Sequence, residues 1–198
     1  CAAWEAQSVS LVGDFNHWQA GRHPMARLSA SGVWAVFIPG LREGGIYKYA
    51  VRSHGGHHLH VKADPYAFRS ELRPRSASVV ASPRPYEWHD AEWMRKRRER
   101  NPLEEPISIY EVHLGSWFRK RETNEWLTYR ELAPILADYV RRKGFTHVEL
   151  LPPAEHFLDR SWGYQVSNYF APTSRYGTPQ DFMYLIDYLH QQGIGVII

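Results

Sequence analysis

Cysteine, long apolar runs and excess charge are all scarce in this sequence of 198 residues. The single cysteine, Cys1, excludes an internal disulfide framework and fits a reducing compartment. No apolar run approaches the ~20 residues that a membrane span needs, and the start lacks the charged and apolar segments of a signal peptide. The net charge of +3 is too small to indicate nucleic-acid binding by itself. We therefore expect no membrane or nucleic-acid partner and a cytoplasmic location, or a plastid location if the source is a plant.

Aromatic and other hydrophobic residues are the abundant groups. Hydrophobic residues make up 43% of the chain, which is enough for a core and excludes wholesale disorder. Eight tryptophans and twelve tyrosines stand out, because aromatic faces suit sugar rings and nucleic-acid bases, although most buried ones simply fill cores. The composition therefore indicates a folded protein of one or two domains, with sugar binding as one open option.

Residues 1–82 contain short runs of β-branched and aromatic residues separated by turn residues. These runs lie at residues 8–12, 33–38, 46–51, 59–62 and 77–80. Their spacing predicts an antiparallel β-sandwich of the immunoglobulin-like kind. Four histidines lie at or beside a Gly-Gly turn, namely His54, His57, His58 and His60. No cysteine or regular ligand spacing accompanies them, so we interpret the turn as a solvated hairpin and expect no metal site and no cofactor.

Residues 83–106 change character and are predicted to form a linker. Four prolines bracket a basic stretch, Arg95–Arg98, with Arg100 close behind. A patch for nucleic acid or another polyanion is one interpretation. Acidic residues flank the stretch, namely Glu92, Glu99 and Glu104. One short solvated helix is therefore the preferred interpretation.

From Ile107 onward the hydrophobic period alternates between strand and helix. Strands are predicted at residues 107–114, 145–151 and 194–198, with two helices between them. Thr128 and Glu131 have capping-box spacing at the start of the first helix, but Pro134 would kink it, so its regular part is expected nearer Glu131. Residues 107–198 are thus predicted to be the start of an α/β domain, the first three strands of a (β/α)₈ TIM barrel.

The segment between the second strand and the second helix, residues 152–177, is long for a loop. Its aromatic residues argue against disorder, and they are Trp162, Tyr164, Tyr169, Phe170 and Tyr176. In a barrel such a loop lies on the C-terminal face, where active sites are built. We therefore expect this segment to be functional.

Several uncommon strings occur in an order that resembles one enzyme family. They are Tyr110–Trp117, Thr146–Pro152, Glu155-His156, Ser161–Gln165 and Tyr169–Pro179. These strings resemble 1,4-α-glucan (glycogen or starch) branching enzymes, which belong to glycoside hydrolase family 13. Three earlier strings resemble the carbohydrate-binding module of family 48 that precedes the barrel of those enzymes, and they are Gly13–Trp18, Tyr47–Tyr49 and Asp64–Ala67.

The resemblance implies a reaction and a partner, an α-glucan such as glycogen, amylose or starch. Branching enzymes cleave an α-1,4 glucan chain and transfer it to a glucose O6 by a retaining double displacement between two carboxylates ~5 Å apart. The family's catalytic carboxylates follow the third strand, so no catalytic residue is expected in this chain. The start at Cys1 without methionine, and the end at Ile198 within a predicted strand, lead to the same expectation of a piece of a larger enzyme.

The Trp-Gly-Tyr-Gln segment contains the predicted substrate-binding residues, Trp162, Tyr164 and Gln165. In the family this segment lines the sugar site next to the cleaved bond. A tyrosine face stacks on a pyranose, and its hydroxyl can bond a neighbouring carboxylate. The alternative is that Tyr164 only packs the loop and that Trp162 only anchors it.

Three ionisable residues near strand ends are ambiguous. Glu149 alternates with Val148 and Leu150, so it points to the opposite side of its strand and could line a barrel. A buried, paired structural acid is the preferred interpretation of Glu149. For His113 and His156 we favour structural hydrogen bonding.

Trp18 and Lys48 match positions that contact glucan in glycogen-binding members of the module family. Those members carry a second tryptophan after the lysine strand, whereas the stretch here is Ser53–His60 without one. The alternative is that Trp18 belongs to the core and that the sandwich mainly packs on the barrel.

Two rival functions remain open beside branching. One is a related family-13 hydrolase with the same leading module, such as a debranching or trehalose-releasing enzyme. The other is a non-catalytic glucan-binding protein, against which the barrel strands after Ile107 argue. The string Glu111–Trp117 favours branching.

Overall fold

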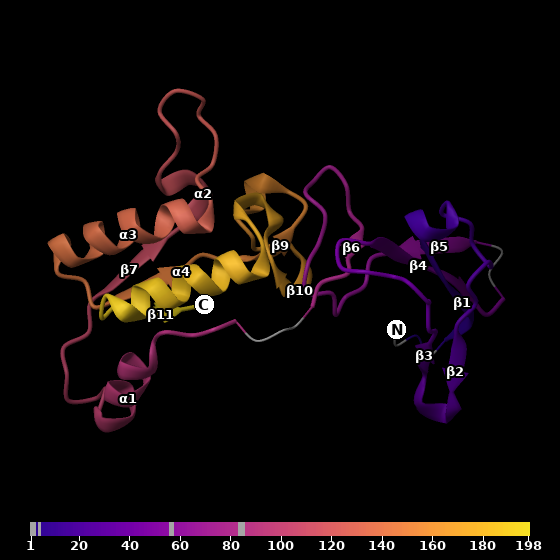
Figure 1. Ribbon diagram of the computed structural model, residues 1–198, viewed down its shortest axis with the longest axis horizontal. Coiled ribbons are helices and arrows are strands. Elements are labelled where there is room, and N and C mark those ends of the chain that lie inside the picture. The colour runs from indigo at the N-terminus through magenta and orange to yellow at the C-terminus, as the bar shows by residue number, and fades with distance from the viewer. Residues whose placement is uncertain (1–2, 4, 56–57, 83–85) are drawn as a thin grey trace. The chain divides into compact units, whose positions relative to one another are not determined.

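The computed structural model describes residue 3 and residues 5–55, 58–82 and 86–198 (Figure 1). The chain divides into two compact units. Unit 1 comprises Cys1–Pro83 together with Asn168–Ala171, and unit 2 comprises Arg84–Ser167 together with Pro172–Ile198. Cys1 and His57, which the sequence analysis discussed, lie outside the described residues. Each unit is described separately below.

Unit 1 is built on an antiparallel sheet in the order β1-β4-β5, with β6 also paired to β4. The bounds of these strands are Ala6–Gly13 for β1, Ile46–Ser53 for β4, Leu59–Lys62 for β5 and Ser78–Val79 for β6. A second, two-stranded sheet joins β2 and β3, which span Ala26–Leu28 and Val33–Ala35. An N-terminal domain of antiparallel sheet is thereby confirmed.

The core of unit 1 follows from the alternation of side chains along its two long strands. Leu11 of β1 pairs with Tyr49 of β4, so both point to the same face of the sheet, and both are buried. Met25 and Trp34 belong to the same buried cluster, together with Ala6 and Val9. The predicted strand at 33–38 ends at Ala35, and β2 was missed because all three of its residues are exposed and show no alternation.

Unit 2 contains a three-stranded parallel sheet in the order β11-β8-β7. These strands span Ile109–Val112 for β7, His147–Leu150 for β8 and Gly195–Ile197 for β11. Two long helices lie between them in the chain, α3 at Tyr129–Lys143 and α4 at Pro179–Gln191, and they pack on each other (Figure 1). An α/β region with a parallel sheet is thus confirmed.

The core of unit 2 lies between one face of the sheet and the two helices. Leu132 and Leu136 of α3, Leu185 and Leu189 of α4, and Val148 of β8 are all fully buried. They recur at helical spacing, as predicted, because residues three and four apart share one face of a helix. The buried faces of the two helices thus pack against the sheet, and the loops extend from the ends of its strands.

Helix α3 begins earlier than predicted. Thr128 caps it, because the Thr128 hydroxyl accepts from the Glu131 amide at 3.2 Å and the Glu131 carboxylate accepts from the Thr128 amide at 2.7 Å. The predicted start nearer Glu131 is therefore wrong. Pro134 is exposed, so its ring faces solvent within the first turns, and the capping box outweighs the single backbone hydrogen bond that it removes.

The segment predicted as a linker contains α1, Ala91–Glu99, whose Arg95 forms ion pairs with Glu92 and Glu99 at 2.8 and 2.9 Å. These exposed pairs fit the solvated helix. The same segment is also bonded to α4, since the buried Asp90 accepts from His190 at 2.7 Å.

The segment 152–177 is not irregular throughout. It contains β9 at Ala154–His156, β10 at Val166–Pro172 and short 3-10 turns at Asp159–Ser161 and Ser174–Tyr176. A further short helix, α2 at Leu114–Trp117, follows β7. None of the helices in the described part of the chain combines the length and apolarity needed to cross a bilayer.

Candidate functional site

The predicted substrate-binding residues lie together on one exposed turn in the segment after β8. The side chains of Trp162 and Tyr164 are 53% and 67% exposed, and Gln165 is exposed beside them. The Trp162 amide donates to the Asp159 carbonyl at 3.1 Å, and the Tyr164 amide donates to the Ser161 carbonyl at 3.0 Å. Backbone bonds therefore hold the turn while both aromatic rings remain partly exposed to solvent.

Gly163 determines the path of this turn. Its φ of +91° lies in the left-handed region, and a Cβ there would overlap the Pro152 carbonyl oxygen. Trp162 is itself left-handed, with a φ of 54°. The turn that carries Tyr164 therefore depends on two consecutive residues of positive φ.

Trp162 stacks on His113, which follows β7. The two ring centroids are 5.5 Å apart and the planes differ by 17°. Burial lowers the pKa of His113, and nearby positive charge from His156, Arg119 and Arg175 lowers it further. The Trp162 ring therefore rests on an imidazole that is neutral at neutral pH, and the contact joins the residue after β7 to the segment that follows β8.

Arg175 lies buried beneath the turn, and the sequence analysis did not single it out. Its side chain is 2% exposed and forms ion pairs with Glu155 at 2.9 Å and with Asp159 at 2.6 Å. The signal in the sequence was an arginine between Ser174 and Tyr176 in a segment that holds two acids, but their proximity is a tertiary feature. Through Asp159, Arg175 thus connects the turn to the buried carboxylate of Glu155.

Glu149 and the two histidines have plainer environments. Glu149 of β8 pairs in register with Glu111 of β7 and is only half-buried. Among the described residues no side chain forms a hydrogen bond or ion pair with its carboxylate. The prediction that Glu149 is buried and paired is therefore not confirmed. His156 is buried, and its Nδ1 bonds to the Ala154 carbonyl at 3.0 Å. His113 bonds to the Ser116 hydroxyl at 2.8 Å. Structural hydrogen bonding of both histidines agrees with these contacts.

In unit 1, Trp18 and Lys48 lie near one end of the β1–β4 pair. Lys48 pairs with Val12, and the carbonyl of the next residue, Gly13, accepts from the Trp18 amide. The Trp18 ring is 41% exposed and donates to Asp14 at 2.8 Å, so the structure does not support its assignment to the core. Lys48 donates to Ser76 at 2.7 Å.

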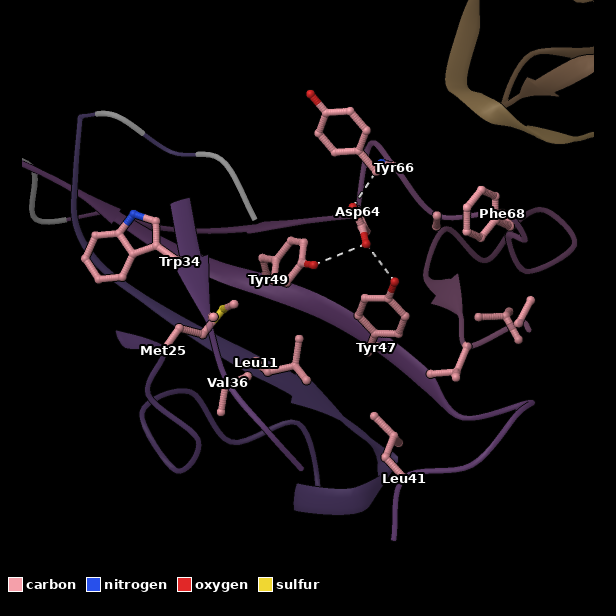
Figure 2. A pocket seen from close by; sticks show the side chains of 15 residues that line it. Leu11, Met25, Trp34, Val36, Leu41, Tyr47, Tyr49, Asp64, Tyr66 and Phe68 are labelled. Atoms are coloured by element: carbon pink, nitrogen blue, oxygen red, sulfur yellow. Dashed lines mark hydrogen bonds between the residues drawn. The ribbon is translucent and has the colours of Figure 1, made fainter. Parts of the chain in front are cut away.

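A cavity of about 430 Å³ opens on the opposite face of β4, lined by core residues such as Leu11, Met25 and Trp34. Figure 2 shows the hydroxyls of Tyr47 and Tyr49 converging on Asp64, to which they donate at 2.7 and 3.1 Å. Burial raises the pKa of both tyrosines, and the Asp64 carboxylate raises them further. The carboxylate thus ties the Asp64 turn to the sheet at the cavity wall.

This arrangement predicts a loss of stability at alkaline pH. Above pH ~10 the unfolded chain releases the protons of Tyr47 and Tyr49 while the folded unit retains them, so the stabilisation is full below pH ~10 and falls above it. Tyr47→Phe should lower stability at pH 7 by about 1 kcal/mol and flatten the alkaline decline. Thermal melting from pH 7 to 11 measures both effects. Tyr169→Phe, at a residue 77% exposed, is the control, and an alkaline decline as steep in Tyr47→Phe as in the control would contradict the assignment.

Within the part of the chain that the structure describes, no group of three or more histidine, cysteine or acidic side chains has metal-binding geometry. The side chains predicted to bind substrate offer two aromatic rings and one amide, and the His113 imidazole lies against Trp162. Such a set can stack on apolar ring faces and hydrogen-bond to hydroxyl groups.

Comparison with known proteins finds a family model that matches unit 1 and relatives that align with the whole chain. Residues 3–67 match the model of carbohydrate-binding module 48 (Isoamylase N-terminal domain). The whole chain is 52% identical to the 1,4-alpha-glucan branching enzyme GlgB of Synechococcus sp. (strain JA-3-3Ab), covering 28% of that protein, and 52% identical to that of Nitrosococcus oceani, covering 26% of it. The chain therefore spans little more than a quarter of the length of these relatives.

A solved structure is similar over almost the whole chain. It is a 1.4 Å crystal structure from Salmonella typhimurium of a protein named as an alpha amylase. The TM-score is 0.71 at 26% identity, and the match covers 99% of this chain and 30% of that one. The structural likeness therefore extends over both the antiparallel unit and the α/β unit.

Proposed function

We propose, on the premise that this chain belongs to the 1,4-alpha-glucan branching enzyme family, that it is part of an enzyme that cleaves α-1,4 glucan chains and transfers them to a glucose O6. The observation that carries the proposal is the identity of 52% over the whole chain. The exposed aromatic turn supports it, because stacking rings beside a neutral imidazole suit a sugar substrate.

The proposal extends to the fold. The three parallel strands of unit 2 are neighbours in the sheet in the same order as in the chain, and helices cover one face of that sheet. This arrangement supports a unit 2 that begins a (β/α)₈ barrel. The two sheets of unit 1 support a β-sandwich. In such a barrel the turn that carries Tyr164 follows the second strand at its carboxyl end, on the face where active sites are built.

In this mechanism the residues of this chain bind and orient the sugar. A retaining double displacement needs one carboxylate as nucleophile and one as proton donor, and a sugar hydroxyl replaces water as the acceptor. We propose that both carboxylates come from parts of the protein outside this chain. Tyr164 would stack on the reacting glucose, while Trp162 and Gln165 would contact the neighbouring ring and its hydroxyls. Like the reaction, a cytoplasmic location is part of the proposal.

The experiment is to incubate amylose with the full-length protein that contains this chain. New α-1,6 linkages, counted by proton NMR, should appear while the number of reducing ends stays nearly constant, because transfer conserves glycosidic bonds. A hydrolase is the second candidate, favoured by the likeness to the Salmonella structure. Reducing ends that rise as the iodine stain fades, without new α-1,6 linkages, would establish hydrolysis instead.

Unit 1 is proposed to hold glucan through Trp18. Because its ring is 41% exposed and fixed by Asp14, Trp18→Ala should weaken glycogen binding about 3- to 10-fold, the contribution of one aromatic platform. The effect is modest because the second tryptophan is missing. Affinity electrophoresis in glycogen gels measures it, with Trp88→Ala as the control, since Trp88 is 45% exposed and lies in unit 2. If glycogen retarded the migration of the two variants equally, Trp18 would not belong to the glucan-binding site.

A further inference from the structure

Arg175 is the centre of a largely buried ion cluster next to the turn that carries Trp162 and Tyr164. Arg175 directs Nε and Nη2 at Asp159, at 2.9 and 2.6 Å, and Nη1 at Glu155 and Thr173, at 2.9 and 3.0 Å. The planar guanidinium therefore bonds to three side chains at once. Such a fork fixes the direction as well as the distance of its partners.

Glu155 is held on its other side as well. It accepts from the Thr173 hydroxyl at 3.1 Å, from the Ser174 amide at 2.8 Å and from the His156 amide at 3.1 Å. A carboxylate bonded this way is a fixed point, because moving it would break several hydrogen bonds at once. Arg175 thus joins a rigid anchor, Glu155, to a second carboxylate.

That second carboxylate belongs to the aromatic turn. Asp159 begins the 3-10 turn Asp159–Ser161, and its carbonyl accepts from the Trp162 amide at 3.1 Å. Its side chain is 38% exposed, so solvation alone would satisfy it without Arg175. The position of Asp159 sets where Trp162 leaves the turn and hence how its ring meets His113.

Buried ion pairs add little net stability compared with apolar side chains of the same volume, but they can select one geometry. We propose that Arg175 is the positioning residue of the sugar-contacting turn. By clamping Asp159 to the Glu155 anchor, it holds Trp162 and Tyr164 in the arrangement that receives the glucan. This inference deepens the proposed function and rests on it.

Asp159→Asn is the cleanest test, because it weakens the arm that reaches the turn and leaves the Arg175–Glu155 pair in place. In the full-length protein we expect KM for amylose to rise about 10-fold or more, with kcat changed less and the melting temperature almost unchanged. Arg175→Lys, which keeps the charge but loses the fork, should raise KM similarly. Asp138→Asn is the control, since Asp138 pairs with Arg142 on the exposed face of α3.

A second readout does not depend on activity. With 5-fluorotryptophan incorporated, the ¹⁹F resonance of Trp162, assigned by its absence in Trp162→Phe, should shift or broaden in Asp159→Asn and stay in place in Asp138→Asn. An unchanged Trp162 resonance in Asp159→Asn would overturn the proposal, and so would a shifted resonance with an unchanged KM. If the wild-type protein had no activity on glucan, the proposed function would fail, while the fluorine spectrum would still report whether Arg175 positions the turn.

Discussion

Replacing Tyr164 by alanine in the full-length protein should lower kcat/KM for α-1,4 glucan by about 10- to 1,000-fold, which corresponds to about 1.4–4 kcal/mol. The ring is 67% exposed on a turn held by backbone bonds, so it is available to a substrate without rearrangement. Its contribution should be largest in the transition state, where the sugar ring distorts and positive charge develops. Steady-state kinetics on amylose measures the change.

Two further variants define what Tyr164 contributes. Tyr164→Phe should lose little if stacking dominates and nearly as much as alanine if the hydroxyl dominates. Tyr169→Ala is the matched control, because Tyr169 is another exposed tyrosine of the segment 152–177. Melting temperatures are measured in parallel. A Tyr164→Ala protein that melts lower but keeps full activity at low temperature would show that the ring only packs the loop.

Among substitutions of the turn that act through the backbone, Gly163→Ala should lower stability and activity most. A left-handed φ of +91° costs a side chain about 1–2 kcal/mol. The added Cβ would also overlap the carbonyl oxygen of Pro152, a backbone atom that cannot rotate away, at a further cost of about 1–3 kcal/mol. We expect a clear fall in melting temperature and at least a ~10-fold loss of kcat/KM, because the displaced turn carries Tyr164.

The control for this change is Gly193→Ala. Gly193 also has a left-handed φ, +77°, but nothing lies within 4 Å of an added Cβ. It should therefore lose only the backbone cost and retain its activity. Equal losses of stability and activity in the two variants would mean that contact with Pro152 does not fix the turn.

Elements whose side chains alternate or repeat could be predicted from the sequence. The helices α3 and α4 follow their hydrophobic periods because each buries one face, and the long strands β1 and β4 follow from their runs of β-branched and aromatic residues. Short elements without such a face could not. Strand β2 is wholly exposed, and β10 alternates irregularly because its aromatic residues Tyr169 and Phe170 are both exposed.

The candidate site was predictable only in part, for a related reason. The exposed residues Trp162, Tyr164 and Gln165 lie in one string, so the sequence identifies them together. The groups that hold them come from elsewhere in the chain. His113 follows a different strand, and Arg175 meets Asp159 and Glu155 only after the segment has folded back on itself. The spacing of residues along the sequence does not predict such tertiary contacts.

The central claim is that the exposed turn of unit 2 contacts the glucan. A crystal structure of the full-length protein with a thio-linked maltooligosaccharide, which resists cleavage, tests it most directly. The account predicts a pyranose ring stacked on the face of Tyr164, with Trp162 still resting on His113. An oligosaccharide bound productively elsewhere, with residues 162–165 free of sugar, would contradict it.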